Sequence, residues 1–155
     1  MKKGITIQNT VDAYNALASI NLLKFDKSAR SAAIKNFASL KSVVEMYEKY
    51  QKDIKDKIFE SKKEEASIVG ELRARLSASK DRVEIMSINH QIISEHSEFI
   101  ALEEECAQMF RNKGNETVEV DVSELSLEQW IDSLVAAEID FSPIDINALE
   151  FMFTK

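Results

Sequence analysis

Two histidines and one cysteine are the residues of this sequence best suited to metal binding or nucleophilic catalysis. His90 and His96 are six residues apart in a segment with helical periodicity, so they project from different faces and cannot share a metal ion. Helical di-iron sites place Glu three residues before His, whereas Ser87 and Ile93 stand at those positions. The sequence therefore predicts no metal site.

Cys106 is the candidate nucleophile, and its neighbours argue against that role. Glu103, Glu104 and Glu105 precede it, and negative charges raise the pKa of a thiol instead of lowering it. The glycines are isolated at positions 4, 70 and 114, which excludes a glycine-rich phosphate loop, a nucleophile elbow and a dinucleotide fingerprint. We therefore expect Cys106 to be a small core residue, and the protein to be no enzyme and to need no cofactor.

The charge distribution divides the chain into a nearly neutral first part and an acidic end. Residues 1–100 contain 17 Lys or Arg and 14 Asp or Glu, whereas residues 101–155 contain 3 and 13. Acidic surfaces repel phosphate backbones, so we expect no direct binding of nucleic acid. One cysteine in the chain excludes an internal disulfide and favours a reducing compartment. The acidic end serves either solubility or the docking of a basic protein partner.

Two apolar patterns with a 3.5-residue repeat predict the elements that hold these residues. One covers 33–58 and the other 85–109, with polar interruptions at Gln51 and Glu95. Such a repeat keeps one apolar seam on one side of a helix, and two seams pack against each other. The predicted seam includes Phe37, Leu40, Val44, Tyr47, Ile54, Ile88, Ile92, Phe99 and Cys106.

These seams predict a long antiparallel helical hairpin over 28–112, resembling a coiled coil. Asp81 with Glu84 is typical of a capping box and begins the second long helix, which is expected to end before Gly114 in a left-handed cap. The hairpin tip lies either at 70–74 or at 77–80. A tip at 70–74 would place Gln51 opposite Glu95 and fix the register with a polar pair; a tip at 77–80 fits the pattern equally well.

The two ends of the chain predict short strands and helices that pack together. Alternating apolar residues predict a strand at 4–9 and another at 117–122, paired antiparallel. Thr10 is the expected N-cap of a helix after the first strand, and Asp26 or Ser28 that of the long helix. Ser126 and Ser142 are the expected N-caps of two C-terminal helices. The fold class is thus mainly α, as a single domain over 1–155 in which 1–27 packs with 113–155.

The C-terminal segment contains more apolar side chains than one face of a short helix can bury. One interpretation is that they close the core; the other is that some of them form an exposed anchor for another subunit or a partner protein. The candidate interaction residues are Trp130, Phe141, Phe151, Met152 and Phe153.

The order of these features resembles a family of small uncharacterised bacteriophage proteins, the domain of unknown function numbered 1617. The similarity covers both ends of the chain and the first long helix. It rests on ITI at 5–7, VDAYNAL at 11–17, LKFDK at 23–27, KNFASL at 35–40 with YE at 47–48, VEVD at 118–121 and IDFSPID at 139–145. The resemblance implies a phage setting and no catalytic activity.

Two functions follow as expectations. The first is a non-enzymatic phage protein that works through protein contacts, as a virion component or assembly factor, with a partner that is either a second copy or another protein. The alternative is a phage effector that inhibits a host defence protein through its acidic, aromatic C-terminal part. The sequence shows no 18-residue apolar run and no apolar core of a signal peptide near its start, so we expect the host cytoplasm or the phage particle and no membrane.

Overall fold

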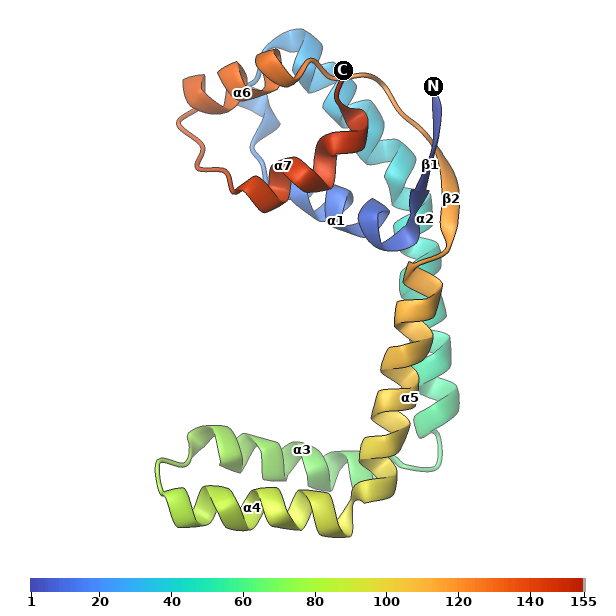
Figure 1. The fold of residues 1–155 in the computed structure, drawn as a ribbon, viewed down its shortest axis with the longest axis vertical. Coiled ribbons are helices and arrows are strands. Elements are labelled where there is room, and N and C mark those ends of the chain that lie inside the picture. The colour runs from blue at the N-terminus through green and yellow to red at the C-terminus, as the bar shows by residue number, and fades with distance from the viewer. Residues whose placement is uncertain (155) are drawn as a thin grey trace. The chain divides into compact units, whose positions relative to one another are not determined.

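The computed structural model describes residues 1–154, and of Ile144 the backbone alone. Helices dominate, and the strands form one two-stranded sheet, which confirms the predicted fold class (Figure 1). The elements in chain order are β1 (Lys2–Thr6), α1 (Ile7–Ala18), η1 (Leu22–Lys24), α2 (Lys27–Phe59), α3 (Lys63–Ala78), α4 (Arg82–Glu95), α5 (Ser97–Gly114), β2 (Thr117–Asp121), α6 (Leu127–Ala136), α7 (Pro143–Leu149) and η2 (Glu150–Met152).

The chain divides into two compact units. Unit 1 comprises Met1–Glu48 and Lys113–Lys155, and unit 2 comprises Lys49–Asn112. Both terminal segments therefore belong to unit 1, together with the first part of α2.

The sheet pairs the two ends of unit 1. β1 runs antiparallel to β2 in the register Lys2↔Asp121 to Thr6↔Thr117, so the predicted pairing is confirmed. The predicted end of the first strand at residue 9 is wrong, as is Thr10 as the N-cap. Thr6 is the N-cap instead. Its Oγ1 accepts a hydrogen bond from the Asn9 backbone N–H at 3.1 Å, and the helix begins at Ile7. Thr10 is buried, and its hydroxyl donates to the Thr6 carbonyl.

The other helix starts follow the predicted capping residues. The Asp26 carboxylate accepts from the Ser28 backbone N–H at 2.9 Å, that of Asp81 from Val83 N–H at 2.9 Å, and Ser126 and Ser142 cap α6 and α7. Glu84 does not complete a capping box, because its carboxylate accepts from the Ser79 hydroxyl. Side-chain oxygens thus satisfy amides that a helix start leaves without partners.

Gly114 does not form the predicted left-handed cap. It is the last residue of α5, and no glycine of the described chain has a positive φ. Gly114 is buried, and a Cβ at this position would make ordinary van der Waals contacts, 3.4 Å to the Tyr47 hydroxyl oxygen and 3.5 Å to Gln8 Cβ.

The second long helix is two helices within unit 2. α4 ends at Glu95 and α5 begins at Ser97, with His96 between them at φ −124°. The His96 ring faces the Glu65 carboxylate of α3, with 3.1 Å from Nδ1 to Oε1. This contact and the break let α4 pack on α3 (Figure 1), while α5 packs on the end of α2 through Phe59 and Phe99, whose ring centroids are 5.3 Å apart.

The hairpin tip predicted at 70–74 lies inside α3, so that alternative is wrong. The α3–α4 turn occupies 79–81 and so overlaps the second predicted position, 77–80. The Gln51–Glu95 pair that depended on the first tip does not form; the Glu95 carboxylate instead accepts from the Gln91 side chain at 3.2 Å.

The predicted seam residues belong to separate clusters. Leu40, with Phe37 packed at its edge, is part of the core of unit 1, and the Phe37 ring stacks on Tyr14 at 4.3 Å. Ile88 and Ile92 form a cluster with Leu72 of α3. Of the remaining predicted seam residues, all but the half-buried Ile54 are buried: Val44, Tyr47, Phe99 and Cys106.

Candidate functional site

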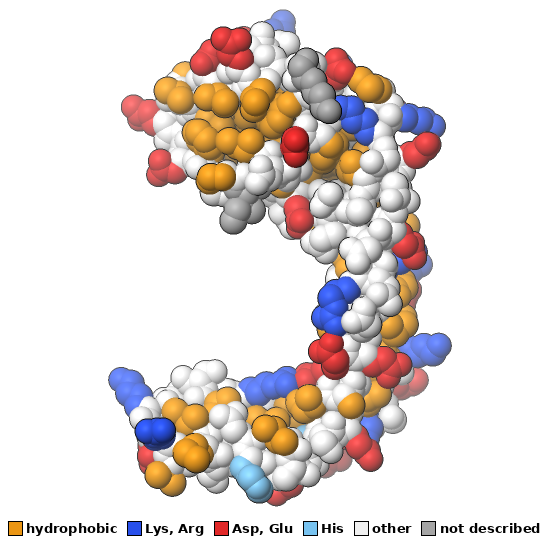
Figure 2. All heavy atoms as spheres, viewed as in Figure 1, with side chains coloured by type: hydrophobic (Ala, Val, Ile, Leu, Met, Phe, Trp, Pro, Cys, Tyr) orange, Lys and Arg blue, Asp and Glu red, His pale blue; other side chains and the backbone are white. Residues whose placement is uncertain are grey.

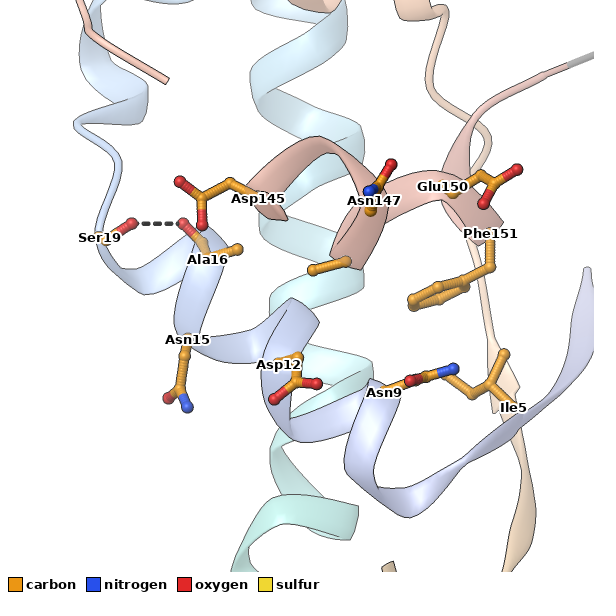
Figure 3. Close-up of a pocket in the computed structure, with 11 residues that line it drawn as sticks. Ile5, Asn9, Asp12, Asn15, Ala16, Ser19, Asp145, Asn147, Glu150 and Phe151 are labelled. Carbon is orange, nitrogen blue, oxygen red and sulfur yellow. Dashed lines mark hydrogen bonds between the residues drawn. The ribbon is translucent and has the colours of Figure 1, made fainter. Parts of the chain in front are cut away.

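A groove of about 590 Å³ lies in unit 1 between α1 on one side and α7 with η2 on the other (Figure 3). We call it the α1–α7 groove. Seven of its eleven lining residues carry carboxylate, amide or hydroxyl groups, and the other four are apolar. The lining residues are Ile5, Asn9, Asp12, Asn15, Ala16, Ser19, Asp145, Asn147, Ala148, Glu150 and Phe151.

One face of α1 forms the first wall. The polar residues Asn9, Asp12, Asn15 and Ser19 recur at steps of three and four, which places them along one side of a helix. The opposite side of α1 carries its buried residues, among them Ile7, Ala13 and Leu17. Burial of that apolar side in the core of unit 1 therefore turns the polar side toward the groove.

The second wall begins at the Ser142 cap, whose hydroxyl accepts from the Asp145 backbone N–H at 3.3 Å. Buried Leu149 and Met152 anchor α7 and η2 in the core of unit 1. Figure 3 shows the Phe151 ring extending from η2 toward Ile5 of β1, so that an aromatic surface closes one end of the groove.

The groove has a negative electrostatic character. Asp12, Asp145 and Glu150 are its ionisable side chains, and none of them forms an ion pair with a described residue. The Asp12 carboxylate accepts from the Gln8 side chain at 2.9 Å. The nearby cation Lys3 donates to the Phe151 carbonyl oxygen and not to a carboxylate of the groove.

The structure separates the five candidate interaction residues into two groups. Trp130, Met152 and Phe153 are at most 8% exposed, so they are core residues of unit 1 and the idea of an exposed anchor is wrong for them. Trp130 packs edge-on against Phe25 at 4.7 Å between ring centroids. Phe141 is 41% exposed, and half-buried Phe151 lines the groove.

The α1 wall of this groove was not predicted from the sequence. The predicted strand included residue 9, and the predicted helix began after Thr10. With the helix starting at Ile7, residues 9, 12, 15 and 19 fall on one side, and that periodicity was the available signal. The second wall was partly anticipated, because Phe151 was among the candidate interaction residues.

A smaller and more apolar cavity of about 430 Å³ lies in unit 2, between Phe59, Phe99 and Phe110. Cys106 lines it and is 4% exposed. Burial raises the pKa of the Cys106 thiol, Lys55 opposes the rise, and Glu103 and Glu105 add to it. A protonated thiol is a poor nucleophile, which agrees with Cys106 as a small core residue.

The two histidines have different contacts. His96 pairs with Glu65 as described, and this hydrogen bond lowers the pKa of the Glu65 carboxyl. His90 is exposed, and its carbonyl oxygen accepts from the Ser94 hydroxyl. Among residues 1–154, no three His, Cys, Asp or Glu side chains lie close enough together to hold a metal ion.

Comparison with known proteins gives no match to this chain, whether with family models, curated proteins or solved structures. Within the described part of the chain, no helix has both the length and the apolar character needed to cross a membrane.

Proposed function

We propose that this protein works through protein contacts and that the α1–α7 groove binds a basic segment of a partner protein. The observation that supports this is the set of three carboxylates, Asp12, Asp145 and Glu150, which form no ion pair with a described residue and line the groove together with the Phe151 ring. Lys or Arg side chains of a partner would pair with the carboxylates, and an apolar residue of the same segment would contact the ring.

The amides of the groove fit an extended peptide. Asn9, Asn15 and Asn147 each offer one acceptor and two donors, so they can pair with backbone N–H and C=O groups of a bound chain. The carboxylates favour a positively charged segment and disfavour nucleic acid, whose phosphates they repel.

The expected strength of the charge contribution is modest. Each exposed ion pair is worth about 0.2–1 kcal/mol, so three pairs together contribute about 0.6–3 kcal/mol, or roughly a 3- to 100-fold change in affinity. Screening at 1 M salt shortens the range of such interactions to about 3 Å, so high salt should remove most of this contribution.

The experiment is a binding titration with a fluorescent peptide that alternates Lys or Arg with Leu or Phe. Neutralising the groove with Asp12→Asn, Asp145→Asn and Glu150→Gln should weaken binding about 3- to 100-fold at low salt, by the energies given above. A matched control neutralises three exposed carboxylates elsewhere, with Glu105→Gln, Glu128→Gln and Asp132→Asn.

The control has the same net charge as the groove variant, so a general attraction to an acidic protein would weaken binding equally in both. That result would contradict the groove as the binding site. Wild-type binding that is not weakened at 1 M salt would also contradict it.

The setting that we propose comes from the resemblance to phage proteins of unknown function: a non-enzymatic virion component or assembly factor. The alternative is an effector that inhibits a host defence protein, and the position of Phe151 and Glu150 in the groove favours it, because both belong to the C-terminal part. Mass spectrometry of purified particles separates the two. The chain at a fixed copy number per particle supports the first, and its absence there with a stoichiometric host complex supports the second.

A further inference from the structure

Helix α4 of unit 2 carries two apolar stripes. The inner stripe, with Ile88 and Ile92, is buried against Leu72 of α3. The outer stripe is exposed in this chain: Val83 is 75%, Met86 65% and Ile93 71% accessible to solvent. Figure 2 shows hydrophobic side chains at the surface of this unit.

The spacing of the outer stripe is that of a helix-pairing seam. Val83, Met86, His90 and Ile93 follow one another at steps of three, four and three. At about 100° per residue, Met86 and His90 lie roughly 160–200° around the helix axis from Ile88, on the side opposite the one that packs on α3. A solvent-exposed seam of this kind is the feature of α4 that its packing in one chain does not explain.

Charge narrows the choice of what covers this face. The residues on and beside the outer stripe are Ser87, Asn89, Ser94 and His90, with Arg82 as its one permanently charged side chain. Lipid-binding helices carry several Lys or Arg beside the apolar stripe, and a strongly charged partner would need charges to pair with. Two copies of a chain with net charge −7 repel each other, and they repel least through a face without carboxylates.

The spacing also favours a second copy, because it reads the same in both directions. In an antiparallel pair related by a two-fold axis, Val83 of each copy faces Ile93 of the other, and Met86 faces His90. A two-fold contact of this kind uses the same patch twice and closes without leaving a free edge. We propose that the outer face of α4 docks a second copy of this chain in antiparallel orientation.

The size of the face sets the strength of the pair. The 14 residues of α4 extend over about 21 Å, so a stripe about 10 Å wide offers roughly 200 Å² of contact per copy. Stable interfaces use about 800 Å² per partner. The dimer is therefore weak, and we expect it to form only at high protein concentration.

Sedimentation equilibrium from 20 µM to 1 mM tests the proposal on the whole chain. The weight-average mass should rise from 17.6 kDa toward twice that value with concentration. Val83→Lys or Ile93→Glu should each weaken association at least tenfold, because each sets a charge against an apolar side chain twice per dimer. Val135→Lys is the matched control, since Val135 is 66% exposed on α6 of unit 1.

Mixing the two variants tests the orientation. In an antiparallel pair, Lys at 83 of one variant faces Glu at 93 of the other, so the mixture should associate more strongly than either variant alone. A monomeric wild type over the whole range, equal weakening by Val135→Lys, or a mixture no stronger than its components would each overturn the proposal. Wild-type binding to phosphatidylcholine vesicles without self-association would overturn it in favour of a lipid surface.

Discussion

Asn36 is the buried polar residue whose replacement tests the packing of unit 1 most directly. Its side chain is 1% exposed. Its Nδ2 donates to the Ser123 carbonyl at 2.8 Å, and its Oδ1 accepts from the Ser123 backbone N–H at 2.6 Å. Since the two residues are 87 positions apart, these bonds join α2 to the segment that follows β2. Asn36→Leu keeps a side chain of similar size and removes both bonds.

The expected loss of stability follows from the Ser123 N–H and C=O groups, which the substitution leaves without their partner. A buried N–H or C=O group without a partner costs about 1–3 kcal/mol. Ser123 is half-buried, so water recovers part of this cost, and we expect the free energy of unfolding to fall by about 2–4 kcal/mol in total. For a chain of this length, 1 kcal/mol corresponds to about 2–4 °C, so Tm should fall by about 5–15 °C.

Trp130 fluorescence is the assay, because Trp130 is the one tryptophan of the chain and is 1% exposed in the core of unit 1. Urea unfolding gives the free energy, and heating gives Tm. Asn115→Leu at an exposed position is the control and should stay within about 0.5 kcal/mol of wild type. A loss below about 1 kcal/mol for Asn36→Leu, or one equal to the control, would refute the reasoning.

Asn36→Asp tests the direction in which stability changes with pH. A protonated Asp can still donate to the Ser123 carbonyl, whereas the ionised form cannot, and burial also disfavours the charge. The folded state therefore raises the pKa of this carboxyl, so the stability of the variant is present at low pH and is lost as the pH rises through that pKa. The variant should be closer to wild type at pH 4 than at pH 7, and the opposite order would contradict the role of the donor.

Three further predictions concern unit 2. Gly70→Ala, inside α3 with no atom within 4 Å of a Cβ, should stabilise the protein by about 0.5–1 kcal/mol in urea unfolding; destabilisation would mean that α3 is not a helix there. The pKa of the Glu65 carboxyl is lowered in the folded protein, so the ionised carboxylate stabilises the fold above the ordinary Glu pKa, and this stabilisation is lost as the pH falls through the pKa of the folded state. Glu65→Gln should therefore reduce stability at pH 7 and have little effect at pH 3. An equal loss at both pH values would contradict the hydrogen bond from His96. The Arg73 guanidinium donates two hydrogen bonds of 2.7 Å to the Glu103 carboxylate, so Arg73→Lys should lower the free energy of unfolding by about 0.3–1 kcal/mol. A double-mutant cycle with Glu103→Gln measures the coupling energy of this pair. A coupling energy of zero would contradict the ion pair.

The helices and the two strands could be predicted because they depend on local periodicity, and their pairing followed because a single strand leaves its backbone groups without partners. Alternation at 117–122 and the serine caps at 126 and 142 act over a few residues. The break at His96 could not be read in the same way, because the apolar pattern continues through it. The His96–Glu65 contact joins residues 31 positions apart, so the residues next to His96 in the sequence do not predict it.

The α1–α7 groove and the buried side chain of Asn36 could not be predicted from local sequence either. Moving one helix start from Thr10 to Ile7 changed which residues share a face of α1, and the cap that decides this, Thr6, competes with Thr10 on equal local terms. Asn36 was invisible as a core residue because asparagine is usually exposed, and its partner Ser123 is distant in sequence. Gly114 was predicted to be a left-handed helix cap, whereas it ends α5 without a positive φ.

The most direct test of the proposed function is a map of backbone amide shifts in the 15N-labelled chain during titration with the basic peptide. We expect the largest shifts in α1 and in α7 with η2, around Asp12, Asp145 and Phe151, and small shifts in α3 and α4. Shifts that follow the acidic face of α5 near Glu104 and Glu105, or that spread evenly over all carboxylates, would contradict the groove as the place where this protein meets its partner.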